Sequence, residues 1–106
     1  MTRRNLLKAL AVTLLVPFTA HGQNQVVLYG TSWCPYCKMA RDLFDRHGIV
    51  YKDYDIERNR QAYDEYKRLG GAGVPLIVIN GKRIYGYDEK RIKNSLGLIG
   101  EGKERD

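Results

Sequence analysis

Apolar residues recur with two different periods in the first half of the chain beyond its N-terminal segment. Residues 26–29 form a short, continuous apolar run rich in β-branched side chains, which predicts a strand buried on both faces. A Gly-Thr-Ser segment ends that run, and residues 35–48 then carry apolar side chains at helical spacing, with Pro35 in the first turn. Residues 49–54 alternate as a strand does, and residues 58–69 carry one apolar helical face before a Gly-Gly pair. This half therefore predicts strand, helix, strand, helix.

The second half has a different pattern. Residues 76–79 and 82–85 are strand-like runs joined by Asn80-Gly81, the pair typical of a two-residue turn, so these two strands should form an antiparallel hairpin. Asp88 can cap a last helix whose inward side chains are Ile92, Leu96 and Ile99. A βαβ unit followed by a ββα unit results. It predicts an α/β fold with a four-stranded mixed sheet flanked by helices.

The first residues have the three parts of an export signal. Arg3 and Arg4 lie in a basic head, residues 9–20 form an apolar run, and Ala20 and Gly22 are small. We expect cleavage before the next residue, glutamine 23. The basic head is similar to the twin-arginine export motif as well as to general secretory signals, so the sequence leaves the route open.

These observations divide the chain into a signal peptide, residues 1–22, and one small domain, residues 23–106. We expect an exported protein, periplasmic or secreted, with no stable membrane insertion after signal removal. Loss of the segment lowers the formal net charge from +6 to +3, because its charged side chains are three basic ones. The remaining basic residues are scattered among acidic ones, a pattern that argues against a nucleic-acid-binding surface.

The two cysteines of the chain lie close together, in the sequence Cys34-Pro35-Tyr36-Cys37. This tetrapeptide spans the predicted end of the first strand and the start of the first helix. The N–H groups and the dipole of a helix N-terminus favour a thiolate, which is the reactive form of cysteine. Two intervening residues allow the sulfurs to bridge reversibly. We expect Cys34 to be the exposed nucleophile and Cys37 a more buried resolving thiol, the two forming a redox-active disulfide.

Other uses of a cysteine pair stay open at this point. A zinc site needs two further ligands, and within the predicted domain the candidate His47 is a whole helix away. A purely structural disulfide would close too short a loop to contribute much stability. The domain can also be a non-catalytic thioredoxin-like binding module in which the cysteines have no chemical role.

The tetrapeptide and its position resemble the glutaredoxins of the thioredoxin-like superfamily. Cys34-Pro35-Tyr36-Cys37 is identical to the active-site sequence of dithiol glutaredoxins, and Gly73-Val74-Pro75 precedes the third predicted strand, where that family has a cis-proline. The resemblance implies a glutathione-linked thiol–disulfide oxidoreductase without metal or bound cofactor. Glutathione would be its co-substrate, and its partners would be glutathione or disulfide-containing proteins. We expect a monomer.

The resemblance also implies a binding site for glutathione or another peptide-like substrate. Its expected residues are Tyr36, Val74, Pro75, Gly86, Tyr87 and Asp88. Two departures leave this site incomplete: Thr31 stands where the family often has a basic residue, and Tyr85-Gly86 stands in place of a Gly-Gly pair. The stretch from Tyr85 to Tyr87 is similar to the redoxins that donate electrons to ribonucleotide reductase and are reduced by thioredoxin reductase. A thioredoxin-reductase-dependent redoxin is therefore the alternative function.

Overall fold

The structure, a computed structural model, describes residues 24–99; the predicted signal segment, residues 1–22, and the last residues, 100–106, lie outside the described part. Strand β1 is central and pairs in parallel with β2 and antiparallel with β3, and β4 extends the sheet beyond β3. The resulting order β2-β1-β3-β4 is the mixed four-stranded sheet that the sequence predicts. The elements in chain order are β1 (Val26–Gly30), α1 (Pro35–Arg46), β2 (Lys52–Asp55), α2 (Arg60–Arg68), β3 (Leu76–Ile79), β4 (Lys82–Tyr85) and α3 (Glu89–Leu96).

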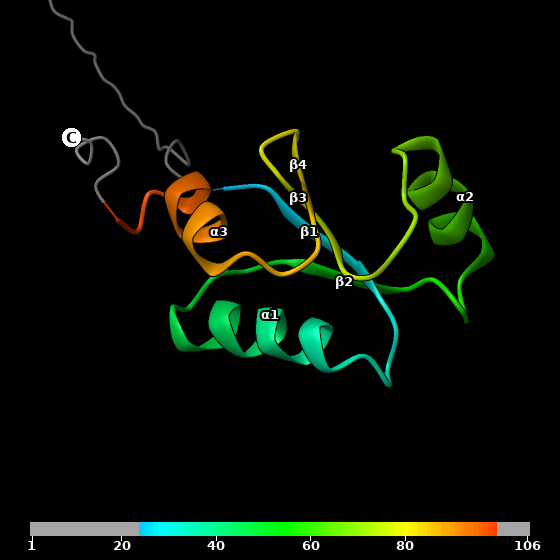
Figure 1. The fold of residues 1–106 in the computed structure, drawn as a ribbon, viewed down its shortest axis with the longest axis horizontal. Helices are drawn as coiled ribbons and strands as arrows, with labels where there is room; N and C mark the ends of the chain where they lie inside the picture. The colour runs from blue at the N-terminus through cyan, green and yellow to red at the C-terminus, as the bar shows by residue number, and fades with distance from the viewer. Residues whose placement is uncertain (1–23, 100–106) are drawn as a thin grey trace, which may run out of the picture.

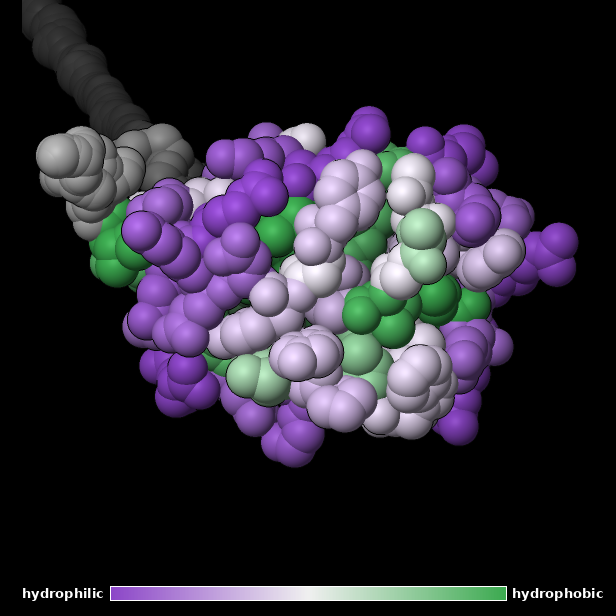
Figure 2. All heavy atoms as spheres, in the orientation of Figure 1, coloured by the Kyte–Doolittle hydropathy of each residue, from purple (hydrophilic) through white to green (hydrophobic). Residues whose placement is uncertain are grey.

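Helices cover both faces of the sheet. Alternate residues of β1 separate two apolar clusters: Leu28 packs in one with side chains of α1 and α3, and Tyr29 packs in the other with Ala62 and Tyr66 of α2. Figure 1 accordingly shows α2 apart from α1 and α3. In the view of Figure 2, hydrophobic residues show only as small patches between hydrophilic ones. The α/β fold predicted from the sequence, a four-stranded mixed sheet flanked by helices, is therefore confirmed.

Several predicted boundaries are wrong by a few residues. Strand pairing at the second strand begins only at Lys52, because Ile49 donates its N–H to Phe44 at the end of α1 and Val50 is exposed. The last helix ends at Leu96, so Ile99 lies beyond it rather than on its inward face. Within residues 24–99, no helix has the length and apolar character that a membrane crossing needs.

Each helix begins at a residue whose side chain accepts a backbone N–H of the first turn. Asn59 caps α2, Asp88 caps α3, and Cys34 caps α1. A cysteine in this position is unusual, since serine, threonine, asparagine and aspartate are the preferred capping residues. The start of α1 therefore departs from the usual capping pattern at the position of the first cysteine.

Candidate active site

Cys34 lies at the junction between the loop after β1 and helix α1. Its Sγ accepts a hydrogen bond from the N–H of Cys37 at 3.2 Å, and its thiol faces the carbonyl oxygen of Val74 at 3.7 Å. The sulfur thereby takes the place of the side-chain oxygen that usually caps a helix. The expectation of an exposed Cys34 is wrong: the residue is 5% exposed, although its neighbours Trp33, Pro35 and Tyr36 are exposed. Cys34 is therefore reached at a shallow, largely covered position.

Cys37 lies one turn into α1 and is fully buried. The pKa of its thiol is raised from 9.0 to about 12, mainly by burial; the hydrogen bond and charge of Cys34 also act to raise it, whereas the backbone of Thr31 and the charge of Arg41 act to lower it. Both cysteines are free thiols, so the structure shows the reduced form. At neutral pH Cys37 is thus held as the protonated partner of the pair.

The loop before β3 brings the second part of the site to Cys34. The Val74–Pro75 peptide bond is cis, as the resemblance implied. Tyr66 of α2 donates its hydroxyl to the carbonyl of Gly73 at 2.9 Å, and the N–H of Gly86 donates to the carbonyl of Pro75 at 2.9 Å. These two contacts fix the residue before Val74 and the residue after it, and so hold the Val74 backbone beside Cys34.

The remaining expected binding residues gather at one end of this loop. Tyr36 stacks on Tyr87, with ring centroids 6.4 Å apart and planes inclined by 18°, and Gly86 leads into that pair from β4. Asp88 follows at the start of α3, where its carboxylate accepts the N–H of Arg91 at 3.1 Å. Contacts thus join Val74 to Cys34, Gly86 to Pro75 and Tyr36 to Tyr87, while Asp88, the next residue, serves as a helix cap.

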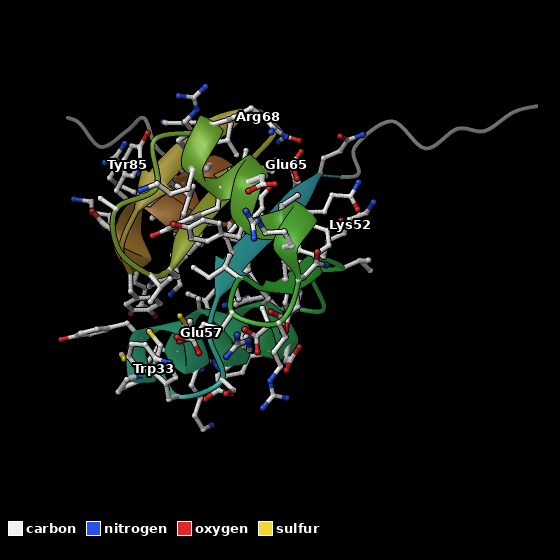
Figure 3. All side chains as sticks on the ribbon, turned by 90° about the vertical axis from the view of Figure 1, so that its right-hand side faces the viewer. Trp33, Lys52, Glu57, Glu65, Arg68 and Tyr85 are labelled. Atoms are coloured by element: carbon white, nitrogen blue, oxygen red, sulfur yellow. The ribbon has the colours of Figure 1, made fainter. Side chains whose placement is uncertain are left out.

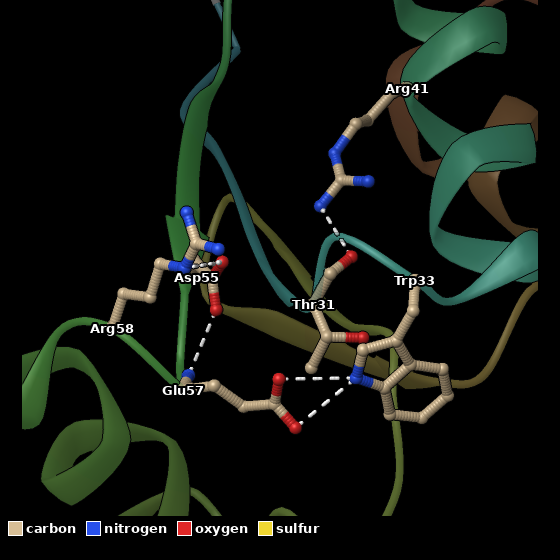
Figure 4. Close-up of polar contacts among 6 residues, drawn as sticks. All are labelled: Thr31, Trp33, Arg41, Asp55, Glu57 and Arg58. Carbon is tan, nitrogen blue, oxygen red and sulfur yellow. Dashed lines mark hydrogen bonds and ion pairs between the residues drawn. The ribbon is translucent and has the colours of Figure 1, made fainter.

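A second contact forms on the other side of Cys34, between Trp33 and Glu57. The indole Nε1 of Trp33 donates to both carboxylate oxygens of Glu57 at 3.1 Å each (Figures 3 and 4). Glu57 belongs to the loop after β2, and the carboxylate of Asp55 shapes that loop by accepting the Glu57 N–H at 2.9 Å. Thr31, in contrast, is buried. The rim of the site formed by Trp33 and Glu57 therefore carries an acidic group, and position 31 contributes no basic side chain to it.

Two expected contributions, a cation from Lys38 and a metal site, find no support in the described residues. Lys38, the residue after the second cysteine, points to the exposed face of α1, where it pairs with Asp42 at 3.1 Å rather than with either cysteine. Across residues 24–99, no group of three or more His, Cys, Asp or Glu side chains is arranged to hold a metal ion.

Three residues at the site escaped the sequence interpretation. Arg41 lies one helical turn beyond Cys37, and that i,i+4 spacing was a usable signal. Glu57 follows β2, and since the ends of the parallel strands β1 and β2 meet at one edge, its nearness to Trp33 was also predictable in outline. Tyr66 had only helical periodicity, which indicates packing and says nothing about a hydroxyl at Gly73.

Comparisons with known proteins agree with this geometry. The family model "Glutaredoxin" matches residues 26–84. A glutaredoxin of Pseudomonas aeruginosa is 34% identical over 75 residues, covering 70% of this chain and 89% of that protein. The solved structure of a glutaredoxin from Archaeoglobus fulgidus superposes with a TM-score of 0.60 at 26% identity, covering 71% and 88% of the two chains. A buckwheat glutaredoxin–glutathione complex gives a TM-score of 0.55 at 26% identity, with 71% and 72% covered.

Proposed function

The chain belongs to the glutaredoxin family, whose members are thiol–disulfide oxidoreductases, and from that premise we propose that it acts through a dithiol mechanism linked to glutathione. The observation that carries the mechanism is the position of Cys34: its Sγ caps helix α1, accepts the Cys37 N–H at 3.2 Å and lies beside the Val74 carbonyl. A sulfur so placed is activated by the helix start and is next to backbone groups that can align an extended substrate.

In the first step the Cys34 thiolate attacks one sulfur of a substrate disulfide. A bond forms between Cys34 and that sulfur, the substrate disulfide breaks, and the departing thiolate takes a proton from water. In the second step the Cys37 thiol loses its proton and attacks Cys34, which forms the Cys34–Cys37 disulfide and releases the second substrate thiol. Two glutathione molecules then reduce the protein disulfide and leave as glutathione disulfide, so electrons balance over the cycle.

Glutathione binding is proposed for the surface between Tyr36 and the start of α3. The backbone of Val74 beside Cys34 offers a carbonyl and an N–H to the peptide part of the ligand. The glutamyl end of glutathione carries an ammonium and a carboxylate, which suit the carboxylate of Asp88 and the free N–H groups of the first turn of α3. The Tyr36–Tyr87 stack would flank the ligand, and Gly86 would leave room for it. The buckwheat glutaredoxin–glutathione complex, a structural neighbour, supports this assignment.

The Trp33–Glu57 contact favours a second candidate, a redoxin reduced by thioredoxin reductase. Glutathione carries two carboxylates, which the carboxylate of Glu57 repels at long range. This repulsion does not apply in the same way to a protein reductant. The two candidates share the cysteine chemistry and differ only in the reductant.

One assay separates the candidates. The full chain is given a small mixed disulfide as substrate, and turnover is driven in parallel by glutathione with glutathione reductase and by thioredoxin reductase. The expected result is glutathione-driven turnover that disappears in Cys34→Ser; it survives in Cys37→Ser because a second glutathione can reduce the mixed disulfide at Cys34 directly. The resolving role of Cys37 is tested separately, by the second thiol that the protein releases from an aromatic disulfide. Turnover with thioredoxin reductase alone, lost in Cys37→Ser, would replace glutathione by the protein reductant, and no turnover with either would contradict the enzyme assignment.

We also propose that residues 1–22 direct export and are removed, leaving a periplasmic or secreted protein of residues 23–106. The support is the basic head followed by an apolar run and small residues. Mass spectrometry of the protein from its own host should show Gln23 as the first residue. An intact Met1 in the soluble fraction would contradict the proposal.

A further inference from the structure

The guanidinium of Arg41 lies close to the buried sulfur of Cys37. Both residues are on α1, four positions apart, so their side chains share one face of the helix. A methyl group built on Gly30 would lie 2.8 Å from the Cys37 Sγ and 3.3 Å from the Arg41 Nη2. The sulfur and that nitrogen are therefore no more than about 6 Å apart.

Two contacts hold Arg41 in this place. Its Nε donates to the carboxylate of Asp53 on β2 at 2.9 Å. Its Nη2 donates to the carbonyl of Thr31 at 3.2 Å, the contact drawn in Figure 4. The side chain is only 21% exposed, in contrast to the arginines of the exposed ion pairs on the surface. A long side chain that could extend into water is instead tied to the loop that precedes the cysteine pair.

The resolving step places a special demand on Cys37. In the free enzyme burial, followed by the hydrogen bond and charge of Cys34, raises the pKa of Cys37 to about 12. In the mixed disulfide Cys34 is uncharged and covalently blocked, so its contributions disappear while burial stays. What then favours the thiolate are the Thr31 backbone and the charge of Arg41.

We propose that Arg41 is a positioning residue for the resolving step: held by Asp53 and Thr31, its guanidinium stabilises the Cys37 thiolate as that thiolate forms and attacks the mixed disulfide at Cys34. The inference rests on the proposed dithiol function. In the step, Cys37 gives up its proton, the Cys34–Cys37 bond forms, the bond from Cys34 to the substrate sulfur breaks, and the departing thiolate takes up a proton. No further oxidant or reductant is needed.

The other groups that face Cys37 do not supply this charge. Tyr66 of α2 is close enough for Cys37 to contribute to its raised pKa, after burial and Tyr63, but its hydroxyl is committed to Gly73. Asp53 on β2 is the counter-ion of Arg41 and partly offsets it. Among the described residues that act on the Cys37 thiol, the cation is Arg41.

The size of the effect follows from the distance and the chemistry of thiols. A unit charge at about 6 Å, partly offset by Asp53, corresponds to about one pKa unit at Cys37. If the pKa of Cys37 rises by one unit when the charge is removed, the thiolate fraction at neutral pH falls about tenfold. The more basic thiolate is, however, roughly threefold more nucleophilic. Removal of the charge should therefore slow the attack of Cys37 by about threefold.

The test separates the two thiol steps in one rapid-mixing experiment on the reduced full chain. The probe is dithiobis(nitrobenzoate), an aromatic disulfide whose thiol product is coloured. Attack by Cys34 releases the first coloured thiol, and attack by Cys37 on the mixed disulfide releases the second. Loss of the second phase in Cys37→Ser identifies the resolving step.

Arg41→Met keeps most of the apolar stem and removes the charge, so the second phase should slow by about threefold and its rise with pH should move to higher pH. Arg41→Lys keeps a cation and should restore most of the rate. Asp53→Asn removes the opposing charge but keeps an amide oxygen that can accept from the Arg41 Nε, so it should speed the second phase, the opposite direction from Arg41→Met; an unchanged urea midpoint excludes a loosened fold as the cause. Arg60→Gln breaks an exposed Arg–Asp pair of the same type on α2 and is the matched control, expected to match the wild type.

The proposal is overturned if the second phase of Arg41→Met is as fast as in the wild type, or if both phases slow equally. It is also overturned if Arg41→Lys loses as much as Arg41→Met, or if Asp53→Asn slows the second phase. Absence of a second phase in the wild type would overturn this proposal together with the dithiol mechanism. If the second phase occurs at a rate that does not depend on the charge at position 41, this proposal alone is contradicted and the dithiol mechanism is not.

Discussion

The contact between Gly30 and Cys37 predicts a large effect from a single methyl group. Gly30 is the last residue of β1, and a Cβ placed on it would lie 2.8 Å from the Cys37 Sγ and 3.3 Å from the Cys37 Cβ. Packed heavy atoms normally lie about 3.5–4.0 Å apart. Because Cys37 is fully buried in the first turns of α1, its sulfur cannot move into solvent. Gly30→Ala therefore forces the strand and the helix apart.

Overpacking of this kind costs about 1–3 kcal/mol of unfolding free energy. A central cost of about 2 kcal/mol lowers the melting temperature of a domain of this size by roughly 8–16 °C. We would measure thermal unfolding of the reduced protein, together with the urea midpoint. Displacement of the Cys37 sulfur should also slow the second phase of the aromatic disulfide assay.

Gly73→Ala is the matched control. A Cβ on Gly73 meets nothing within 4 Å, and its backbone lies outside the left-handed region. Alanine there should be neutral in stability, or stabilising by about 0.4–1 kcal/mol through the unfolded state. A melting temperature for Gly30→Ala within the error of the wild type would refute the close contact, and an equal loss in both variants would trace the effect to glycine replacement in general.

Further predictions concern the rim, the loop and the resolving thiol. Glu57→Gln keeps an acceptor for Trp33 and removes the charge; it should lower the KM for a glutathione mixed disulfide by up to about fivefold, the range of an exposed charge interaction of about 0.2–1 kcal/mol, and the gain should shrink at high salt. An unchanged KM at low salt would show that the acidic rim does not act on glutathione. Tyr66→Phe removes the hydroxyl that binds Gly73 and should cost about 1 kcal/mol in urea unfolding; a midpoint equal to that of the wild type would contradict the role of this bond. Alkylation at neutral pH, mapped by mass spectrometry, should modify Cys34 well before Cys37, whose pKa is raised to about 12 mainly by burial. Since the folded protein keeps a proton on Cys37 that the unfolded chain loses above about pH 9, this residue should also weaken the fold as the pH rises from about 9 to about 12, so Cys37→Ser should flatten that part of the stability profile; equal alkylation of both thiols, or an unchanged profile, would count against the raised pKa.

The order of the elements and the identity of the cysteine pair could be predicted from the sequence because their causes are local. The period of apolar residues predicts helix or strand, Asn80-Gly81 forms the turn of the β3–β4 hairpin, and the predicted capping residue Asp88 lies where α3 starts. The two-residue spacing of Cys34 and Cys37 likewise limits their chemistry without reference to the rest of the chain.

The exposure of Cys34 and the environment of Cys37 were decided only by the tertiary structure. Cys34 is covered because the Val74 loop, 40 residues later in the chain, folds against it. Gly30 and Arg41 acquire their significance only when the end of β1 packs on the first turns of α1. Long-range packing sets distances between segments, and solvent exclusion and charge act on a thiol through those distances. Residue identity at one position therefore predicts the reactive group, and the fold decides how it is activated.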